Sequence, residues 1–158
     1  MKVYGILFSE EEDNEGNKYL LSGLQFPGLI SETGIPIINN KGNLLGRVTD
    51  YMPVYNAITD ESATLAMKAD LVESAPDGDE NVLTGGSYLQ LKYPFCKINA
   101  YLLDHPALKE AINAGNLYFG FEAKSLKQIA NTLFKYSIEK VTLTISPKQK
   151  CSKVYFKE

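Results

Sequence analysis

Histidine, cysteine and long apolar runs are scarce in this 158-residue sequence, and each scarcity excludes a class of function. The single histidine is His105, so any histidine-dependent mechanism must use it. The two cysteines, Cys96 and Cys151, match no metal-binding or redox spacing, which indicates free thiols in a reducing compartment. No apolar run approaches the roughly 18 residues of a membrane span, and we expect neither a signal region nor a membrane partner.

Basic residues are outnumbered, with 16 Lys and Arg against 19 Asp and Glu, and the net charge is −3. Because no overall basic field attracts a phosphate backbone, we expect no nucleic-acid partner. The acidic run from Glu10 to Glu15 lacks the alternating oxygen ligands and central glycine of a calcium loop. A GxxxxGK phosphate loop is also missing from the sequence. We therefore expect neither a metal nor a cofactor.

One main helix is predicted at residues 105–114. Asp104 is a suitable N-cap, Pro106 fits the first turn, and Gly115 supplies a left-handed exit. Apolar residues at helical spacing form one stripe along it, and these are Ala107, Leu108, Ala111 and Ile112. A helix of about ten residues is marginal alone in water, so we expect packing against the rest of the chain to hold it.

Strand patterns dominate the rest of the sequence and predict a mainly β (α+β) fold in a single domain, 1–158. The expected strands are 2–8, 19–26 as its hairpin partner, 35–38, 44–48, 62–71, 87–93, 97–103, 117–121, 132–146 and 154–156. Gly46 suggests a bulge or a close backbone approach, and 125–131 is expected to add one helical turn. We expect a β-barrel, or a strongly curved antiparallel sheet of about eight strands, carrying the helix.

No nucleophile stands in a recognisable catalytic pattern. The serines considered lie outside any GxSxG elbow, and these are Ser87, Ser125, Ser137 and Ser146. His105, beside Asp104 at the helix start, is expected to be a surface residue that assists the cap. The 10 tyrosines suit either core packing or a contact surface, because each combines apolar area with a hydroxyl.

Three segments carry a family resemblance when they are taken in order. They are PIINNKGNLLGRVTD from Pro36, DHPALKEAINAGNLYFGFEAK from Asp104 and YSIEKVTLTISPKQK from Tyr136. This ordered set resembles the tailed-phage prohead proteases, capsid maturation enzymes whose fold is shared with herpesvirus assemblin. The opening KVYGILFSEEED is similar to the first strand and acidic turn of that family. The resemblance covers most of the chain and implies a barrel of the prohead-protease type.

The family's two reacting groups are replaced in this sequence. Lys41, or Asn40 if the register slips by one, stands where the family carries its catalytic histidine, and Phe121 stands where it carries its serine. Loss of either group from such a pair costs about 10⁶ in turnover, so the resemblance implies a scaffold with no catalytic residue. A second departure is the stretch at about 73–103, interposed before the helix segment. It predicts an inserted loop or hairpin that offers a new contact surface.

The resemblance therefore implies a non-enzymatic virion protein rather than an enzyme. We expect an auxiliary protein that decorates or stabilises the phage capsid, with the major capsid protein as its partner and other head proteins or a second copy as further candidates. Its expected location is the virion, and the host cytoplasm before assembly. Two alternatives stay open: a divergent active maturation protease that uses Ser125 or Cys96, and a pseudoprotease that regulates an active one.

Overall fold

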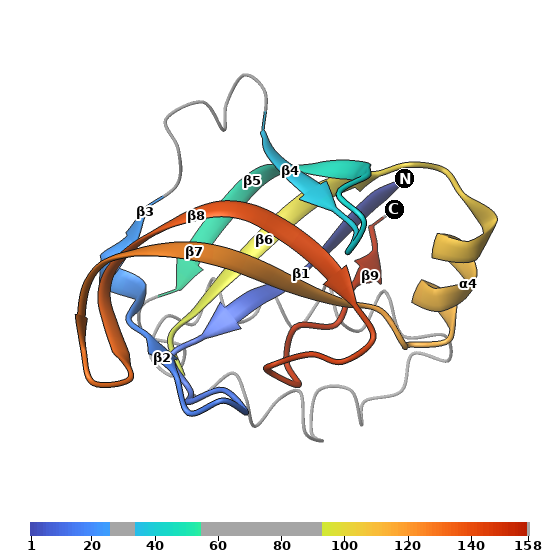
Figure 1. Cartoon of the computed structure of the whole chain (residues 1–158). Helices are drawn as coiled ribbons and strands as arrows, with labels where there is room; N and C mark the ends of the chain where they lie inside the picture. The colour runs from blue at the N-terminus through green and yellow to red at the C-terminus, as the bar shows by residue number, and fades with distance from the viewer. Residues whose placement is uncertain (26–33, 55–92, 158) are drawn as a thin grey trace.

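The computed structural model describes residues 1–25, 34–54 and 93–157, which form a mainly β structure (Figure 1). The strands are β1 (Lys2–Ser9), β2 (Lys18–Tyr19), β3 (Leu24–Gln25), β4 (Ile35–Ile38), β5 (Leu44–Val54), β6 (Phe95–Leu102), β7 (Tyr118–Ile129), β8 (Thr132–Thr144) and β9 (Tyr155–Phe156). A 3-10 turn, η1 (Leu21–Gly23), separates β2 from β3, and the α-helix is α4 (Pro106–Asn113). Over these described ranges, the prediction of a mainly β fold with one main helix is confirmed.

The strands form a single mixed sheet of the order β2-β8-β4-β5-β6-β1-β9, in which β3 and β7 also pair with β8. β7 pairs antiparallel with β8 along most of its length, whereas β2, β3 and β4 pair with β8 in parallel, one after another. The expectation of an antiparallel sheet is therefore wrong, because the chain after the acidic turn runs alongside β8. As formed by the described strands, the sheet is strongly curved but not closed, so it is not a barrel (Figure 1).

The C-terminal tail connects the two ends of this open sheet. The Phe119 amide donates to the Ser152 carbonyl at 2.8 Å, and the Val154 amide donates to the Leu117 carbonyl at 2.9 Å. Beyond these bonds, β9 pairs with β1 as an edge strand, as expected. The two chain ends lie side by side in Figure 1. The tail therefore brings the start of β7 close to β1.

β1 does not form the expected hairpin with residues 19–26. It pairs antiparallel with β6 along its length and with β9 at its start. Alternate residues of β1 are buried in two different clusters, with Val3 in the main core and Tyr4 in a smaller cluster that contains Val54 and Phe95. A strand that is apolar on both faces belongs inside a sheet, so distant strands replace the local partner.

The strands that contribute buried residues to the main core are β1, β4, β5, β6, β7 and β8. Its largest buried members are Leu7, Phe8, Leu21, Ile35, Ile37, Ile98, Phe119 and Tyr136. The expected close approach at Gly46 is confirmed, because a Cβ there would lie 2.0 Å from the Tyr101 carbonyl oxygen. At this point β5 and β6 can pair only if the side chain is absent.

The expected helical turn at 125–131 is also wrong, because β7 continues as a strand to Ile129. Ile129 pairs with Thr132 across a tight turn in which Ala130 has a φ of 52°. Isolated residues of this stretch favour a helix. However, β8, which is rich in β-branched and aromatic residues, lies beside the stretch and forms the hydrogen bonds that its backbone groups need. Pairing between strands overrides local propensity here.

α4 confirms the predicted helix but moves its cap by one residue. His105 Nδ1 accepts a hydrogen bond from the Ala107 amide at 3.1 Å, so His105 is the N-cap. Pro106 disfavours helical geometry in the residue before it, which leaves His105 extended and in the capping position. Asp104 instead pairs with Lys109 Nζ at 2.7 Å. Gly115 has the expected left-handed φ, of 72°.

The interposed stretch at 73–103 is described only at its end. β6 lies between β5 and β1, so this part of the expected insert is a central strand. Residues 73–92 lie outside the described residues, as do the expected strand at 62–71 and nearly all of the one at 87–93. Within the described ranges, no helix is long and apolar enough to cross a membrane.

Candidate functional site

Lys41 and Phe121 occupy very different surroundings. Lys41 lies exposed in the turn between β4 and β5, where Asn39 Oδ1 accepts its amide at 2.9 Å. Phe121 is half-buried on β7, with its ring centroid 5.4 Å from that of Phe8 and 5.0 Å from that of Tyr19. The two segments join the same sheet through β8, which pairs with both β4 and β7. Lys41 belongs to a turn, and Phe121 belongs to an aromatic cluster.

The two cysteines are poor nucleophiles in this fold. Cys96 is fully buried on β6, and burial raises the pKa of its thiol strongly. Cys151 lies in the tail, where burial is the main cause that raises its pKa to about 11. Because the thiolate is the reactive form, both groups are almost entirely unreactive near neutral pH.

Ser125 is exposed on β7, with Tyr136 as its cross-strand neighbour. Ser137 lies on β8 and Ser146 follows its end, while Ser87 is outside the described residues. His105 serves as a helix cap through Nδ1. The pKa of the neighbouring Asp104 is lowered by its hydrogen bond to Lys109 and by the charge of that lysine. Among the described residues, no hydrogen bond joins Ser125, Ser137 or Ser146 to His105.

A cleft of about 230 Å³ opens beside Phe121. It lies between the first half of β7, the end of β8, the acidic turn after β1 and the C-terminal tail. It is lined by Leu7, Asp13, Tyr19, Phe119, Gly120, Phe121, Glu122, Thr142, Thr144, Ser146, Lys148, Gln149 and Ser152. Gly120 makes room between the two strands, because a Cβ there would lie 2.6 Å from Thr142 Oγ1.

Asp13 is the most deeply buried charged group of this cleft, with 8% of its surface exposed. Its Oδ1 accepts the amides of Glu15 and Asn17 at 2.9 Å each, which closes the acidic turn. Within the described part of the chain, its second oxygen, Oδ2, has no protein hydrogen bond. Asp13 therefore has a structural oxygen and a second oxygen that a ligand can use.

Tyr19 and Lys148 complete the polar lining. Burial raises the pKa of the Tyr19 phenol, the positive charge of Lys148 opposes this, and Asp13 and Glu15 add to the rise. Lys148 Nζ lies 3.3 Å from Glu15 Oε2, and both side chains are about half exposed at the rim. On the other side, Glu122 pairs with Lys140 at 2.9 Å. These charged pairs surround the mouth, while Asp13 lies inside.

Sequence reasoning did not find this cleft. Asp13 was considered only as part of a calcium-like acidic run, and Tyr19 only as part of an expected strand. Among the described residues, no group of three or more His, Cys, Asp or Glu side chains could hold a metal ion. The lining residues come from β1, the acidic turn, β2, β7, β8 and the tail, and no local spacing connects them. The sequence feature that indicates a space beside this strand is Gly120, a glycine between two aromatic residues.

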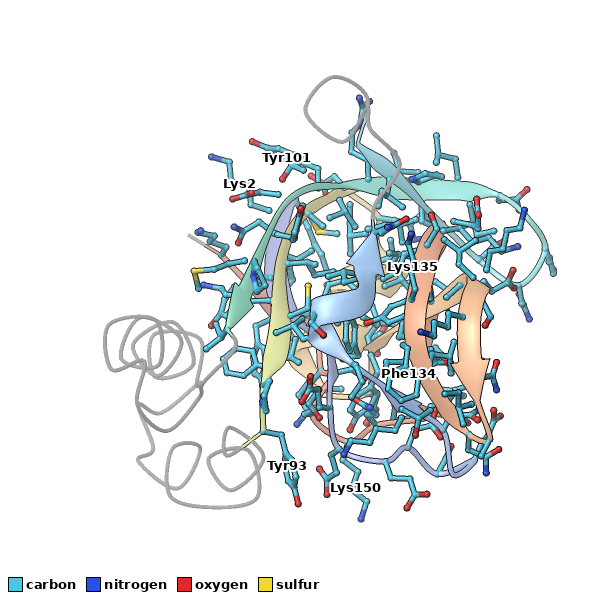
Figure 2. All side chains as sticks on the ribbon, turned by 90° about the vertical axis from the view of Figure 1, so that its left-hand side faces the viewer. Lys2, Tyr93, Tyr101, Phe134, Lys135 and Lys150 are labelled. Atoms are coloured by element: carbon cyan, nitrogen blue, oxygen red, sulfur yellow. The ribbon has the colours of Figure 1, made fainter. Side chains whose placement is uncertain are left out.

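A second surface is the outer part of the β7–β8 hairpin, residues 123–137, here called the distal arm. It carries Lys124, Lys127 and Lys135 and contains no Asp or Glu. Its exposed apolar side chains are Leu126 (48% exposed), Ile129 (61%) and Phe134 (38%). Figure 2 looks onto this end of the molecule and shows Phe134 and Lys135 on it. The distal arm is thus basic and apolar on an acidic protein.

No protein-family model, curated protein or solved structure matches this chain. The resemblance to prohead proteases rests on the ordered segments alone.

Proposed function

We propose that this chain is a non-enzymatic auxiliary protein of a phage virion, built on an inactivated prohead-protease scaffold, that binds the capsid shell. The observation that carries the proposal is the packing of Phe121 against Phe8 and Tyr19, at the position that corresponds to the family's serine. An aromatic side chain built into the core has replaced the nucleophile, and Lys41 lies in an exposed turn. Such a scaffold retains binding as its function.

The distal arm is the surface best suited to attachment. Exposed Leu126, Ile129 and Phe134 provide apolar area, and the lysines between them provide positive charge. Aromatic side chains that become buried at the centre of an interface, inside a polar rim, often contribute much of its binding energy. The proposed partner surface is therefore an acidic and partly apolar patch of the major capsid protein.

Lys127 and Lys135 lie directly opposite each other in the β7–β8 ladder. Like charges in such a pair destabilise a sheet, by up to about 1 kcal/mol. The acidic turn leads into β2, and the Lys18 amide at the start of β2 donates to the Asn131 carbonyl at the tip of the arm at 2.9 Å. Because this lysine pair does not help the fold, it supports a role in binding an anionic partner.

Cosedimentation with purified empty shells of the capsid protein tests the proposal. We expect the full chain to bind at micromolar concentration, and the double variant Lys127→Gln/Lys135→Gln to bind about tenfold more weakly. The matched control, Lys41→Gln/Lys150→Gln, also removes two positive charges from exposed sites and should bind like the unaltered chain. Absence of binding, or equal losses in both variants, would contradict the proposal.

Incubation with scaffold and capsid subunits separates this function from its alternatives. We expect no new protein termini, because Cys96 is buried and Phe121 has no reacting group. New termini that disappear in Ser125→Ala or Cys96→Ala would establish the divergent protease instead. Capture of an active maturation protease without shell binding would favour the regulatory pseudoprotease.

A further inference from the structure

We infer that the cleft beside Phe121 binds a cationic group on a short alkyl stem, such as an arginine or lysine side chain or a free alkylamine. This binding site is separate from the distal arm and does not depend on the proposed attachment to a capsid. Its size, its apolar walls and its buried carboxylate each contribute to the inference.

The volume of the cleft limits what it can hold. Pockets for cofactors and drug-sized ligands usually span about 300–1,000 Å³. The cleft measures about 230 Å³, so it has room for a single long side chain or a small molecule of similar size. An extended chain or a nucleotide would not be enclosed by it.

The inner walls are apolar and favour an alkyl stem. Leu7 and Phe119 are buried in the main core, and Phe121 and Tyr19 pack edge to face with their ring centroids 5.0 Å apart. Aromatic rings also attract cations that approach their faces. A purely polar ligand would leave these surfaces without contacts, whereas an alkyl stem would cover them.

The buried carboxylate selects the charge of the ligand. Asp13 is more than nine-tenths buried, and Oδ2 is the atom that its turn leaves unused in the described structure. A buried charge is costly unless it is paired and hydrogen-bonded. A guanidinium or ammonium group would supply both a donor and the opposite charge at this oxygen.

The charged groups at the mouth are compatible with a cation. Glu15 and Lys148 bind each other, and Glu122 and Lys140 bind each other, so each pair contributes little net charge. The carboxylate of Asp13 is left as the uncompensated charge of the lining. Tyr19 and Ser146 also line the cleft, and hydroxyl groups of their kind can accept N–H donors of a guanidinium.

Nuclear magnetic resonance titration with N-butylguanidinium tests the inference on the full chain. We expect the amide signals of Gly120 and Phe121 to shift, and we expect N-butylurea, a neutral molecule of nearly the same shape, to bind about tenfold more weakly. Equal affinities for the two, or tighter binding of the anion butyrate, would overturn the inference. A titration that shifts signals elsewhere but not at these amides would also overturn it.

Asp13→Asn is the decisive variant, because its Oδ1 can still accept the amides of Glu15 and Asn17 and close the turn. We expect it to lose about tenfold in affinity for N-butylguanidinium and to change little for N-butylurea. Glu11→Gln removes an equal charge from an exposed site outside the lining and should leave both affinities unchanged. Similar losses in the two variants would show a general charge effect and overturn the inference.

The source of the cation is distinguished by a second pair of ligands. An acetylated and amidated Gly-Arg-Gly peptide represents a protein segment, and N-butylammonium represents a free amine. Tighter binding of the peptide would assign the cleft to a partner chain, and tighter binding of the amine would assign it to a small molecule. Failure of both to bind would overturn the inference without affecting the cosedimentation test of the distal arm.

Discussion

The two halves of the β7–β8 hairpin are built from the same pair of strands and have opposite characters. In the inner half, Phe119, Ile138 and Val141 are buried, and the tail and β4 pair with the strands. In the distal arm, all of β7 from Lys124 onward is exposed, and three lysines lie in a stretch that contains no Asp or Glu. The inner half serves the core and the cleft, whereas the distal arm places only Leu133 and Tyr136 of β8 in the core and exposes its β7 side.

Neighbouring elements account for this difference more than the strand sequences do. β8 is rich in β-branched and aromatic residues along its whole length, as in its segments TLFKYSIE and KVTLT. The inner half faces β1 and the tail across the curved sheet, while the distal arm has only the short β2 and β3 along β8. A strand extends as far as its backbone groups form hydrogen bonds with a neighbouring strand. The exposure of its side chains depends on which other elements pack over them.

The largest expected effect contrasts the two halves directly. Ile138→Ala should lower the free energy of unfolding by about 3 kcal/mol, because Ile138 is fully buried in the main core. Leu126→Ala should cost less than about 1 kcal/mol, since about half of that side chain already contacts water. Urea denaturation of both variants gives the two values. Comparable losses would show that the distal arm is part of the core.

Thiol labelling compares the reactivity of a cysteine in the tail, which packs against the inner half, with that of a cysteine on the distal arm. At about pH 8, Cys151 should react with a disulfide reagent about a hundredfold more slowly than a cysteine introduced by Ser125→Cys on the distal arm. The cause is the raised pKa of Cys151 and its partial burial in the tail. Rates measured on the unfolded chain provide the reference. Equal rates in the folded protein would show that the tail opens freely.

The raised pKa of Cys151 also predicts a pH dependence of stability. The neutral thiol is favoured in the folded state. Its contribution to the free energy of unfolding is therefore fully present below the unfolded pKa of about 8.5. It should be lost as the pH rises through the folded pKa, which is about 11. Denaturation midpoints of the parent chain and Cys151→Ala should converge across this range. A constant difference would contradict the assignment.

Phe121→Ser introduces the hydroxyl that the resembled family carries. We expect a loss of about 2 kcal/mol in stability, since the half-buried ring packs against Phe8 and Tyr19. We expect no proteolysis, because a serine alone lacks an activating base. Phe121→Leu is the control and should retain most of the packing. Peptide cleavage by the serine variant alone would show that a base lies within reach.

Lys135→Glu has the smallest expected effect on stability, and we expect it to change stability and shell binding in opposite directions. It replaces a like-charge pair with an ion pair opposite Lys127 and should stabilise the chain by about 0.5 kcal/mol. The same change should weaken binding to capsid shells. Lys150→Glu, at an exposed site in the tail, should change neither property. If Lys135→Glu lost both stability and binding, the distal arm would be structural.

Periodicity and turn chemistry were sufficient to predict several elements. The helix at 106–113, the strands at 2–9, 35–38 and 132–144, and the glycines at 46 and 115 all agree with their predictions. The predicted N-cap, Asp104, is wrong by one residue. The other two wrong local predictions, the hairpin of β1 and the helical turn at 125–131, both depended on which strands would pair. Pairing partners lie far apart in the chain, so no local pattern reports them.

The cleft was out of reach of sequence reasoning for the same reason. Asp13 is a candidate binding residue only because it is buried in the same cleft as Phe121. Phe121 follows β1 by more than a hundred residues. The sequence also places three lysines in 123–137, yet it cannot show that two of them face each other. Register across the hairpin, shifted by bulges between Ser125 and Lys127, produces that pair.

By itself, the sequence determined that the chain is mainly β, that one short capped helix precedes the β7–β8 hairpin, and that no recognisable catalytic motif is present. These properties follow from side-chain periodicity, from proline and glycine geometry, and from residue identity. Only the tertiary structure decided that β2, β3 and β4 run parallel to β8, that the sheet stays open, and that Asp13 lies buried in a cleft. The physical reason is that burial and strand pairing are properties of distant segments brought together.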